Sequence, residues 1–195
     1  MEYKGVLVGL GNPGRRYADT RHNMGFLLVS ALLEFAGKQG GFDELNGTRF
    51  SCALHRIHLP QLGGLWLAAK PLTFMNESGR CVRPLLAWHK LDPSRLVVAH
   101  DELDIPAGTV RFKLAGGDAG HNGLKSVTQH LGTRDYYRLR MGIGRPLHKE
   151  DVLNWVLGRP DETNAALLRT ALPKALETLF TFADKGLEAA RNQAC

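Results

Sequence analysis

The residues best suited to chemistry are histidines, asparagines and an aspartate in four loops that follow expected strands. The loops read GNPGRRYADTRHN from Gly11, TFMNESG from Thr73, AHDELD from Ala99 and GGDAGHNG from Gly116. In open α/β sheets, ligands bind at the carboxyl ends of the strands. The loops therefore supply six candidate site residues, which are Asn12, His22, Asn76, Asp101, His121 and Asn122.

Each candidate also has a structural role open to it. His22 or Asn76 can cap the helix that follows it, and Asn122 beside Gly123 can form a turn. Asp101 can act as a cap or pair with an arginine. A single polar residue is more often structural, but four loops that all carry His, Asn or Asp favour a shared site.

The residue types in these loops suit hydrolysis by an activated water. No G-x-S-x-G motif occurs, and the cysteines Cys52, Cys81 and Cys195 have no evident base partner. A neutral histidine can deprotonate water while an aspartate holds its ring in the correct tautomer. Asparagine side chains can hydrogen-bond a carbonyl oxygen without adding charge. The set therefore indicates hydrolysis of an activated acyl compound such as an ester.

A metal site is the main alternative chemistry. His22, His100, Asp101 and His121 are all possible ligands. However, His100 and Asp101 are adjacent in an expected strand, so their side chains leave opposite faces. No H-x-x-x-H or C-x-x-C spacing occurs, and we expect the acidic stretch DELD to be solvated at a strand end. The expected site therefore contains no metal.

The first loop also matches the dinucleotide-binding formula G-x-G-x-x-G at positions 9–14. In that fingerprint the helix begins within the glycines, and an acidic residue follows about 20 residues later. Here nine residues, RRYADTRHN, follow the glycines, and Pro13 removes one backbone donor. We therefore expect these glycines to allow a close-packed turn at the end of the first strand.

Positive charge is expected beside the glycine-rich loop. The net charge is +6, which modestly favours an anionic partner. Arg111 and Lys113 share one face of an expected strand, as do Arg138 and Arg140. If the two strands are neighbours, four cations line one surface and Lys125 adds to them. A solvated sheet face is the alternative interpretation, although the nearby site favours a phosphate for Lys113 and Arg140.

The composition and length of the chain fit one ordinary globular domain. The chain has 195 residues, of which 44% are hydrophobic and 23% charged. It contains no apolar run long enough to span a membrane and no secretion signal is expected. Its three cysteines are too few and too scattered for a disulfide framework, so we expect a reducing cytoplasm.

Strand and helix patterns alternate along the chain. They predict one α/β domain over residues 1–195, with a twisted mixed sheet flanked by helices. Pro84 is expected to kink its helix or shift its start, and Pro173 to break the last long helix. The expected strands are 4–10, 49–59, 64–70, 95–104, 109–114 and 136–144, and the expected helices 26–36, 78–90, 124–131, 151–157 and 160–190.

Seven segments together resemble the bacterial peptidyl-tRNA hydrolases. They are VGLGNPG, Tyr17, TRHNMG, TFMNESG, VAHDELD, KLAGGDAGHNGLKS and YRLRMGIGRP, in the family's order from about Lys4 to Ala183. The resemblance implies a monomeric, cofactor-free α/β enzyme that cleaves the ester between a peptide and the 3′ end of tRNA. The tail beyond about residue 183 is variable in this family and receives no role.

The resemblance also implies roles for single residues. His22 matches the catalytic base and Asp101 the carboxylate that orients it. Asn12, Asn76 and Asn122 match residues that position the peptide and its carbonyl. Tyr17, Phe74, Met75 and His121 match residues that line the cleft. Lys113 and Arg140 match a clamp on the tRNA 5′-phosphate.

Asp118 departs from the family pattern, which has mostly small or neutral residues there. An acid at this position can weaken phosphate binding or change the geometry of the loop.

Two other hypotheses remain open. One is a non-catalytic RNA-binding relative of the same fold, and the other is a nucleotide-dependent enzyme, which the spacing of the first loop disfavours.

Overall fold

A seven-stranded mixed β-sheet forms the centre of the protein in the computed structural model, which describes residues 2–194. β1 lies parallel to β4 and β5, and β5 lies parallel to β7. The pairs β2–β3, β3–β4 and β6–β7 are antiparallel, and the strand order is β2-β3-β4-β1-β5-β7-β6. The strands are β1 (Gly5–Gly9), β2 (Phe42–Leu45), β3 (Cys52–Ile57), β4 (Trp66–Pro71), β5 (Leu96–Glu102), β6 (Val110–Leu114) and β7 (Tyr137–Gly142).

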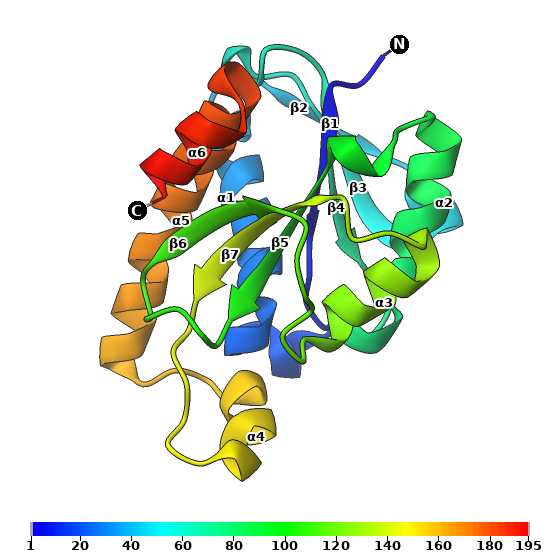
Figure 1. Cartoon of the computed structure of the whole chain (residues 1–195). Helices are drawn as coiled ribbons and strands as arrows, with labels where there is room; N and C mark the ends of the chain where they lie inside the picture. The colour runs from blue at the N-terminus through cyan, green and yellow to red at the C-terminus, as the bar shows by residue number, and fades with distance from the viewer. Residues whose placement is uncertain (1, 195) are drawn as a thin grey trace.

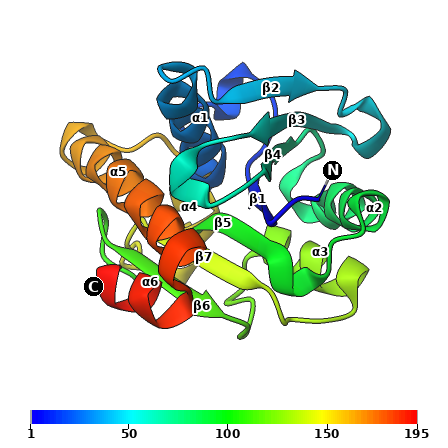
Figure 2. The same cartoon turned by 90° about the horizontal axis from the view of Figure 1, so that it is seen from above.

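Helices cover both faces of this sheet (Figures 1 and 2). α1 (Met24–Gly37), α5 (Glu162–Lys185) and α6 (Leu187–Gln193) pack on one face. α2 (Gly79–His89) and α3 (Asn122–Leu131) pack on the other, and α4 (Val152–Leu157) lies beyond the ends of β5 and β7. No helix within residues 2–194 is long and apolar enough to cross a membrane. The short 3₁₀ helices are η1 (Arg15–Tyr17), η2 (Arg21–Asn23), η3 (Thr48–Phe50), η4 (Pro60–Leu62), η5 (Met75–Glu77), η6 (Pro93–Arg95) and η7 (Lys149–Asp151).

The central strands are buried on both faces. Leu7 packs into the apolar core beneath α1 and α5, whereas Val6 and Val8 pack into the core beneath α2 and α3. Because successive side chains alternate between the faces, a strand covered on both sides must be apolar throughout. This explains the continuous run in β1 and confirms the predicted α/β architecture.

The carboxyl ends of β1 and β5 lie side by side at the point where the chain reverses its direction across the sheet. The strands that follow β1 in sequence, β2 to β4, lie on one side of it, and β7 and β6 lie beyond β5. Ligands of open α/β sheets bind at such a switch point. η2 and the last residues of β5 meet there.

Close packing explains the first glycines. A Cβ atom on Gly9 would lie 2.1 Å from the carbonyl oxygen of Gly25, and a Cβ on Gly25 would lie 2.3 Å from the backbone nitrogen of Leu10. The start of α1 therefore rests directly on the end of β1, which fixes η2 immediately before it. α1 begins only at Met24, so the glycines do not open a helix as a dinucleotide fingerprint requires.

The structure differs from the expected helices and strands at Pro173 and at β2. Pro173 does not break α5, which continues to Lys185 and ends at Gly186 with φ of 81°. A proline fits helical φ and removes one hydrogen bond, and the buried residues on both sides, from Leu168 to Leu179, hold α5 on the core. The unpredicted strand β2 has only four residues, FDEL, and its pairing depends on β3, which follows it in the chain.

Pro84 is likewise accommodated inside α2. The helix begins at Gly79, within one residue of the expected start, and continues past the proline to His89. Cys81, Val82, Leu85 and Leu86 are buried in the core beneath α2 and α3. Their burial offsets the hydrogen bond that the proline cannot make.

Candidate active site

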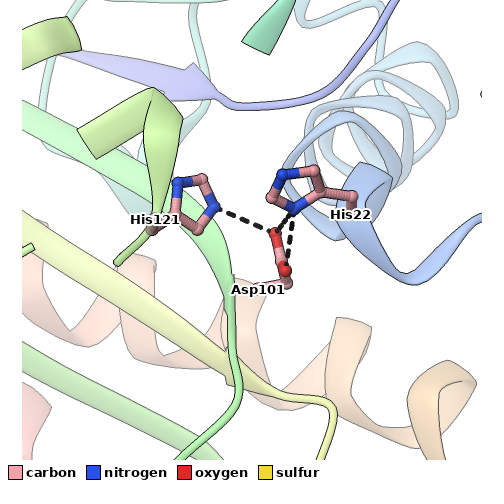
Figure 3. A group of neighbouring side chains, drawn as sticks. All are labelled: His22, Asp101 and His121. Atoms are coloured by element: carbon pink, nitrogen blue, oxygen red, sulfur yellow. Dashed lines mark hydrogen bonds and ion pairs between the residues drawn. The ribbon is translucent and has the colours of Figure 1, made fainter. Parts of the chain in front are cut away.

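His22, Asp101 and His121 meet at the carboxyl ends of β1 and β5, as Figure 3 shows. The Nδ1 atom of His22 lies 2.9 and 3.0 Å from the two carboxylate oxygens of Asp101. The Nε2 atom of His121 lies 3.1 Å from one of these oxygens. Residues nearly 80 positions apart, on η2 and β5, thus form a direct contact.

The partners of the two rings define their tautomers. The Nδ1 atom of His121 accepts hydrogen bonds from the backbone N–H groups of Gly123 and Leu124, which makes His121 the N-cap of α3. Its proton therefore resides on Nε2 and is donated to Asp101. His22 donates its Nδ1–H to the same carboxylate, so its Nε2 is left as the basic atom.

The buried carboxylate controls the proton affinity of His22. Burial alone would lower the pKa of His22, but the negative charge of Asp101 and the hydrogen bond to it outweigh burial and raise this pKa above its usual value. Burial would raise the pKa of Asp101, but His22 and His121 hold that pKa well below its usual range. Asp101 is therefore a carboxylate at neutral pH.

Asn12 is fixed at the start of the first loop, just after β1, by three hydrogen bonds. Its side-chain oxygen accepts from the backbone N–H of Met75 at 2.9 Å. Asn23 accepts from the Asn12 backbone N–H at 2.8 Å and donates to the Asn12 carbonyl at 3.0 Å. Among residues 2–194, the side-chain NH₂ of Asn12 has no partner, so it remains available to a ligand.

Sequence reasoning did not identify Asn23, although it is almost completely buried beside His22. Its role depends on a contact with the backbone of Asn12, eleven residues earlier, and no spacing rule predicts such a contact. The side-chain oxygen and the NH₂ group of Asn23 are both hydrogen-bonded to the backbone of Asn12, so the two ends of the first loop are held together. Asn23 therefore positions Asn12 relative to His22.

A cavity of about 370 Å³ opens beside the His22–Asp101–His121 cluster. Asn122 lines it together with these three residues. One wall comes from α4, which contributes Val152, Leu153 and Val156, and Leu153 is 64% exposed. The sequence prediction named none of these α4 residues, although the apolar pattern VLNWVL in a short helix was a usable signal.

The remaining predicted cleft residues lie in neighbouring loops and differ in their exposure to solvent. Phe74 and Asn76 are exposed, and Asn76 makes no capping hydrogen bond to α2. Met75 is buried, and a Cβ on Gly123 would lie 2.5 Å from its sulfur atom. Tyr17 is half-buried and stacks beneath Arg16. A contact of Tyr17, Phe74 or Asn76 with a ligand stays a prediction.

The strands β6 and β7 are neighbours, as the proposed basic surface requires. Arg111 lies opposite Arg140, and Lys113 lies opposite Arg138. The expectation that all four cations line one surface is nevertheless wrong, because Arg138 is only 1% exposed. Lys125 is exposed on the first turn of α3.

Asp118 neutralises this buried arginine. Its carboxylate lies 3.3 Å from Nη2 of Arg138 and accepts from the Thr128 hydroxyl at 3.1 Å. Arg138 also donates to the carbonyl of Gly117. A buried guanidinium therefore holds the glycine-rich loop, and Asp118 serves as its counter-ion.

The three acids of DELD are paired. The expected solvation is wrong for Asp101 and Glu102, which are buried, whereas Asp104 is half exposed. Glu102 binds Nε of Arg140 at 3.0 Å, and Asp104 binds Arg145 at 2.6 Å. Asp101 binds two histidines. β7 pairs parallel to β5. This pairing places Arg140 of β7 beside Glu102, and Arg145 of the following loop beside Asp104. The local sequence does not reveal these contacts.

The donor set at the centre of the site also has a spacing that a metal ion can use. One ligand atom each from His22, Asp101 and His121 lies within 4.8 Å of the others. However, both imidazole nitrogens already donate protons to the carboxylate, so an ion would have to displace them. His100 binds the Asp101 backbone carbonyl through Nδ1 at 2.7 Å and is not part of this set.

Fold and site together define an α/β protein with a buried His–Asp pair that opens into a cavity. A model of the family described as peptidyl-tRNA hydrolase matches residues 6–195. A peptidyl-tRNA hydrolase of Desulfovibrio desulfuricans is 65% identical over 97% of this chain and 83% of its own length. A second, from Nitratidesulfovibrio vulgaris, is 49% identical over 97% and 95%. The chain therefore belongs to the peptidyl-tRNA hydrolase family.

Solved structures agree with this assignment. The crystal structure of peptidyl-tRNA hydrolase from Acinetobacter baumannii superposes with a TM-score of 0.90 at 35% identity. The match covers 100% of this chain and 96% of that one. The family resemblance and the fold class predicted from the sequence are both confirmed.

Proposed function

We propose that this protein hydrolyses the ester bond that joins a peptide to the 3′ end of tRNA, and that His22 and Asp101 activate the water. The observation that carries this proposal is the buried contact of 2.9 Å between His22 Nδ1 and Asp101, beside a cavity of about 370 Å³. This contact leaves Nε2 of His22 as a base whose ring is held in one orientation. Family membership supplies the substrate class.

Water is the nucleophile in the proposed reaction. Nε2 of His22 removes a proton from the water as its oxygen attacks the ester carbonyl carbon. The bond from this carbon to the 3′ oxygen of the ribose then breaks, and the proton passes from His22 to the leaving oxygen. The products are a free tRNA 3′-hydroxyl and a peptide carboxylic acid, which releases its proton to solvent at neutral pH. Asp101 stabilises the imidazolium that forms between the two steps.

Neutral amides position the substrate in this proposal. The free NH₂ of Asn12 donates to the carbonyl oxygen as negative charge develops on it. Asn76 and Asn122 bind the peptide amide, which an aminoacyl-tRNA with a free amine lacks. Tyr17, Phe74, Met75 and His121 form the walls around the acyl group. Lys113 and Arg140 bind the tRNA 5′-phosphate.

The physiological setting is also a proposal. Peptidyl-tRNA released from ribosomes is found in the cytoplasm, and the buried free thiols of Cys52 and Cys81 suit a reducing compartment. Cys195 lies outside the described residues. We infer that the enzyme acts as a monomer and without a cofactor, since one chain supplies the base, the orienting acid and the amides.

The direct test measures peptide release from N-acetyl-aminoacyl-tRNA and from the same tRNA with a free amine. The proposal expects hydrolysis of the acetylated substrate alone, at an unchanged rate after incubation with EDTA. Binding of tRNA without hydrolysis would support a non-catalytic RNA-binding protein instead. Loss of activity in EDTA that Zn²⁺ restores would assign the water to a metal at His22, Asp101 and His121.

A further inference from the structure

A second hollow, of about 410 Å³, lies at the free edge of β6. It shares no lining residue with the cavity beside His22. Figure 2 shows α6 beside β6 at this edge of the sheet. The residues that line the hollow are Arg111, Phe112, Lys113, Arg140, Glu188, Arg191 and Asn192.

Positive charge in this hollow exceeds negative charge. Four lining residues are Arg or Lys, and Glu188 is the one acid among them. Arg140 is bound by Glu102 through Nε, and Arg191 by Glu188 at 3.1 Å. Burial and the nearby charges of Arg140 and Arg138 lower the pKa of Lys113. Crowded cations of this kind are stabilised by an anion.

The lysine is held against the glycine-rich loop. A Cβ on Gly116 would lie 2.7 Å from Nζ of Lys113, so the ammonium group lies directly against this loop. Gly116 has a φ of 111°, which also favours glycine. Lys113 therefore joins the loop near His121 to the hollow at the sheet edge.

The C-terminal helix is fixed at this hollow. Arg111 donates from Nη1 to the carbonyl of Ala194 at 2.9 Å, just beyond the end of α6. Ala190 and Ala194 are buried in the core beneath α1 and α5. Arg191 and Asn192, on the exposed side of the same helix, are thereby held at the rim. Donors on a fixed helix lose little conformational freedom when they bind a ligand.

We propose that this hollow binds a second backbone phosphate of the RNA substrate, with Arg111 and Arg191 as ligands beside Lys113 and Arg140. The proposal rests on the function proposed above and gives the C-terminal segment a role in RNA binding. Guanidinium groups suit phosphate because they present paired N–H donors, and the Asn192 amide adds a neutral donor. The hollow is open at the edge of the sheet, so an RNA strand could continue on both sides of a phosphate that is bound in it.

The test compares Arg191→Gln and Arg111→Gln with the wild-type protein in hydrolysis of N-acetyl-aminoacyl-tRNA. Each variant is expected to raise KM roughly five- to tenfold, with the effect on KM rather than kcat. The log–log slope of KM against salt is expected to fall by about 0.7–0.9 per lost phosphate contact. Arg191→Lys retains the charge and is expected to restore most of the slope.

Arg56→Gln is the matched control. Arg56 is also an arginine bound to one carboxylate, Asp43 at 2.7 Å, but it lies on β3 in the opposite half of the sheet. Its KM and salt slope are expected to equal those of the wild type. If Arg191→Gln and Arg111→Gln also leave both quantities unchanged in an active enzyme, the phosphate subsite is wrong while the proposed function stands. An inactive wild-type protein would contradict the function itself, and salt-dependent tRNA binding would then test the subsite separately.

Discussion

The carboxylate of Asp101 has two effects on His22, because it fixes the ring and raises its proton affinity. Both follow from one contact inside a buried site, where an ion pair is weakly screened. His121 contributes a second donor to the same carboxylate and also caps α3. The orientation of the base is thus tied to the start of the helix that carries Asn122.

This contact predicts the pH dependence of the reaction. The pKa of His22 is raised above its usual value of 6.5, and only the neutral ring can accept a proton from water. The value of kcat/KM should therefore fall as pH decreases through this raised pKa, with a midpoint above pH 6.5. In Asp101→Asn the carboxylate charge is lost, so the midpoint should move to lower pH.

The maximal rate of Asp101→Asn should also fall, by about 10²–10⁴, because an amide can stabilise the wrong tautomer. Rates of peptide release between pH 5 and 9 would measure both effects. An unchanged midpoint in Asp101→Asn would show that another group controls the titration.

The His–Asp pairing illustrates what single residues reveal before a fold is known. Their types suggested a base and its orienting acid, but the residue-by-residue assignment came from the family resemblance. The contact of His121 with Asp101 and the clamp formed by Asn23 depend on loops that meet only in the folded chain. Such contacts between distant segments leave no local signal.

At the scale of elements, the glycine-rich loop is attached to β7 through Asp118 and Arg138. Arg138 is inaccessible to solvent, so a buried charge would lose its counter-ion in Asp118→Ala. Breaking a buried pair from one side costs about 3 kcal/mol in the free energy of unfolding. Urea denaturation of Asp118→Ala should show a loss of this size.

Asp104→Ala is the control for that measurement, because Asp104 and Arg145 form an ion pair that is half exposed. Removal of a surface pair should cost less than about 1 kcal/mol. Equal losses in the two variants would mean that Asp118 is not the counter-ion of a buried charge. Asp118→Asn, which retains a hydrogen-bond acceptor, should fall between them.

Strands and helices with a strong apolar pattern were predictable, whereas those set by tertiary contacts were not. The run in β1 and the alternation in β6 required no knowledge of their neighbours. β2 is a strand because it pairs with β3, and α5 continues through Pro173 because its buried face holds it. Helix and strand propensities of single residues include neither the pairing of β2 with β3 nor the burial of one face of α5.

At the scale of the molecule, the sheet order relates the candidate reaction site to the basic hollow. The candidate reaction site lies at the ends of β1 and β5, and the basic hollow lies two strands away from β5, at β6. The hollow gathers four of the chain's cations, Arg111, Lys113, Arg140 and Arg191, at this edge of the sheet. The sequence indicated an excess of positive charge. Only the strand order shows where the basic residues of β6 and β7 lie relative to the candidate site.

The central claim is that His22 removes the proton from the attacking water. The most direct measurement is single-turnover hydrolysis of N-acetyl-aminoacyl-tRNA by His22→Ala, with circular dichroism to verify that the variant is folded. The account predicts a rate about 10²–10⁴ lower than wild type at the same tRNA affinity. A folded variant that releases peptide at the wild-type rate would contradict it.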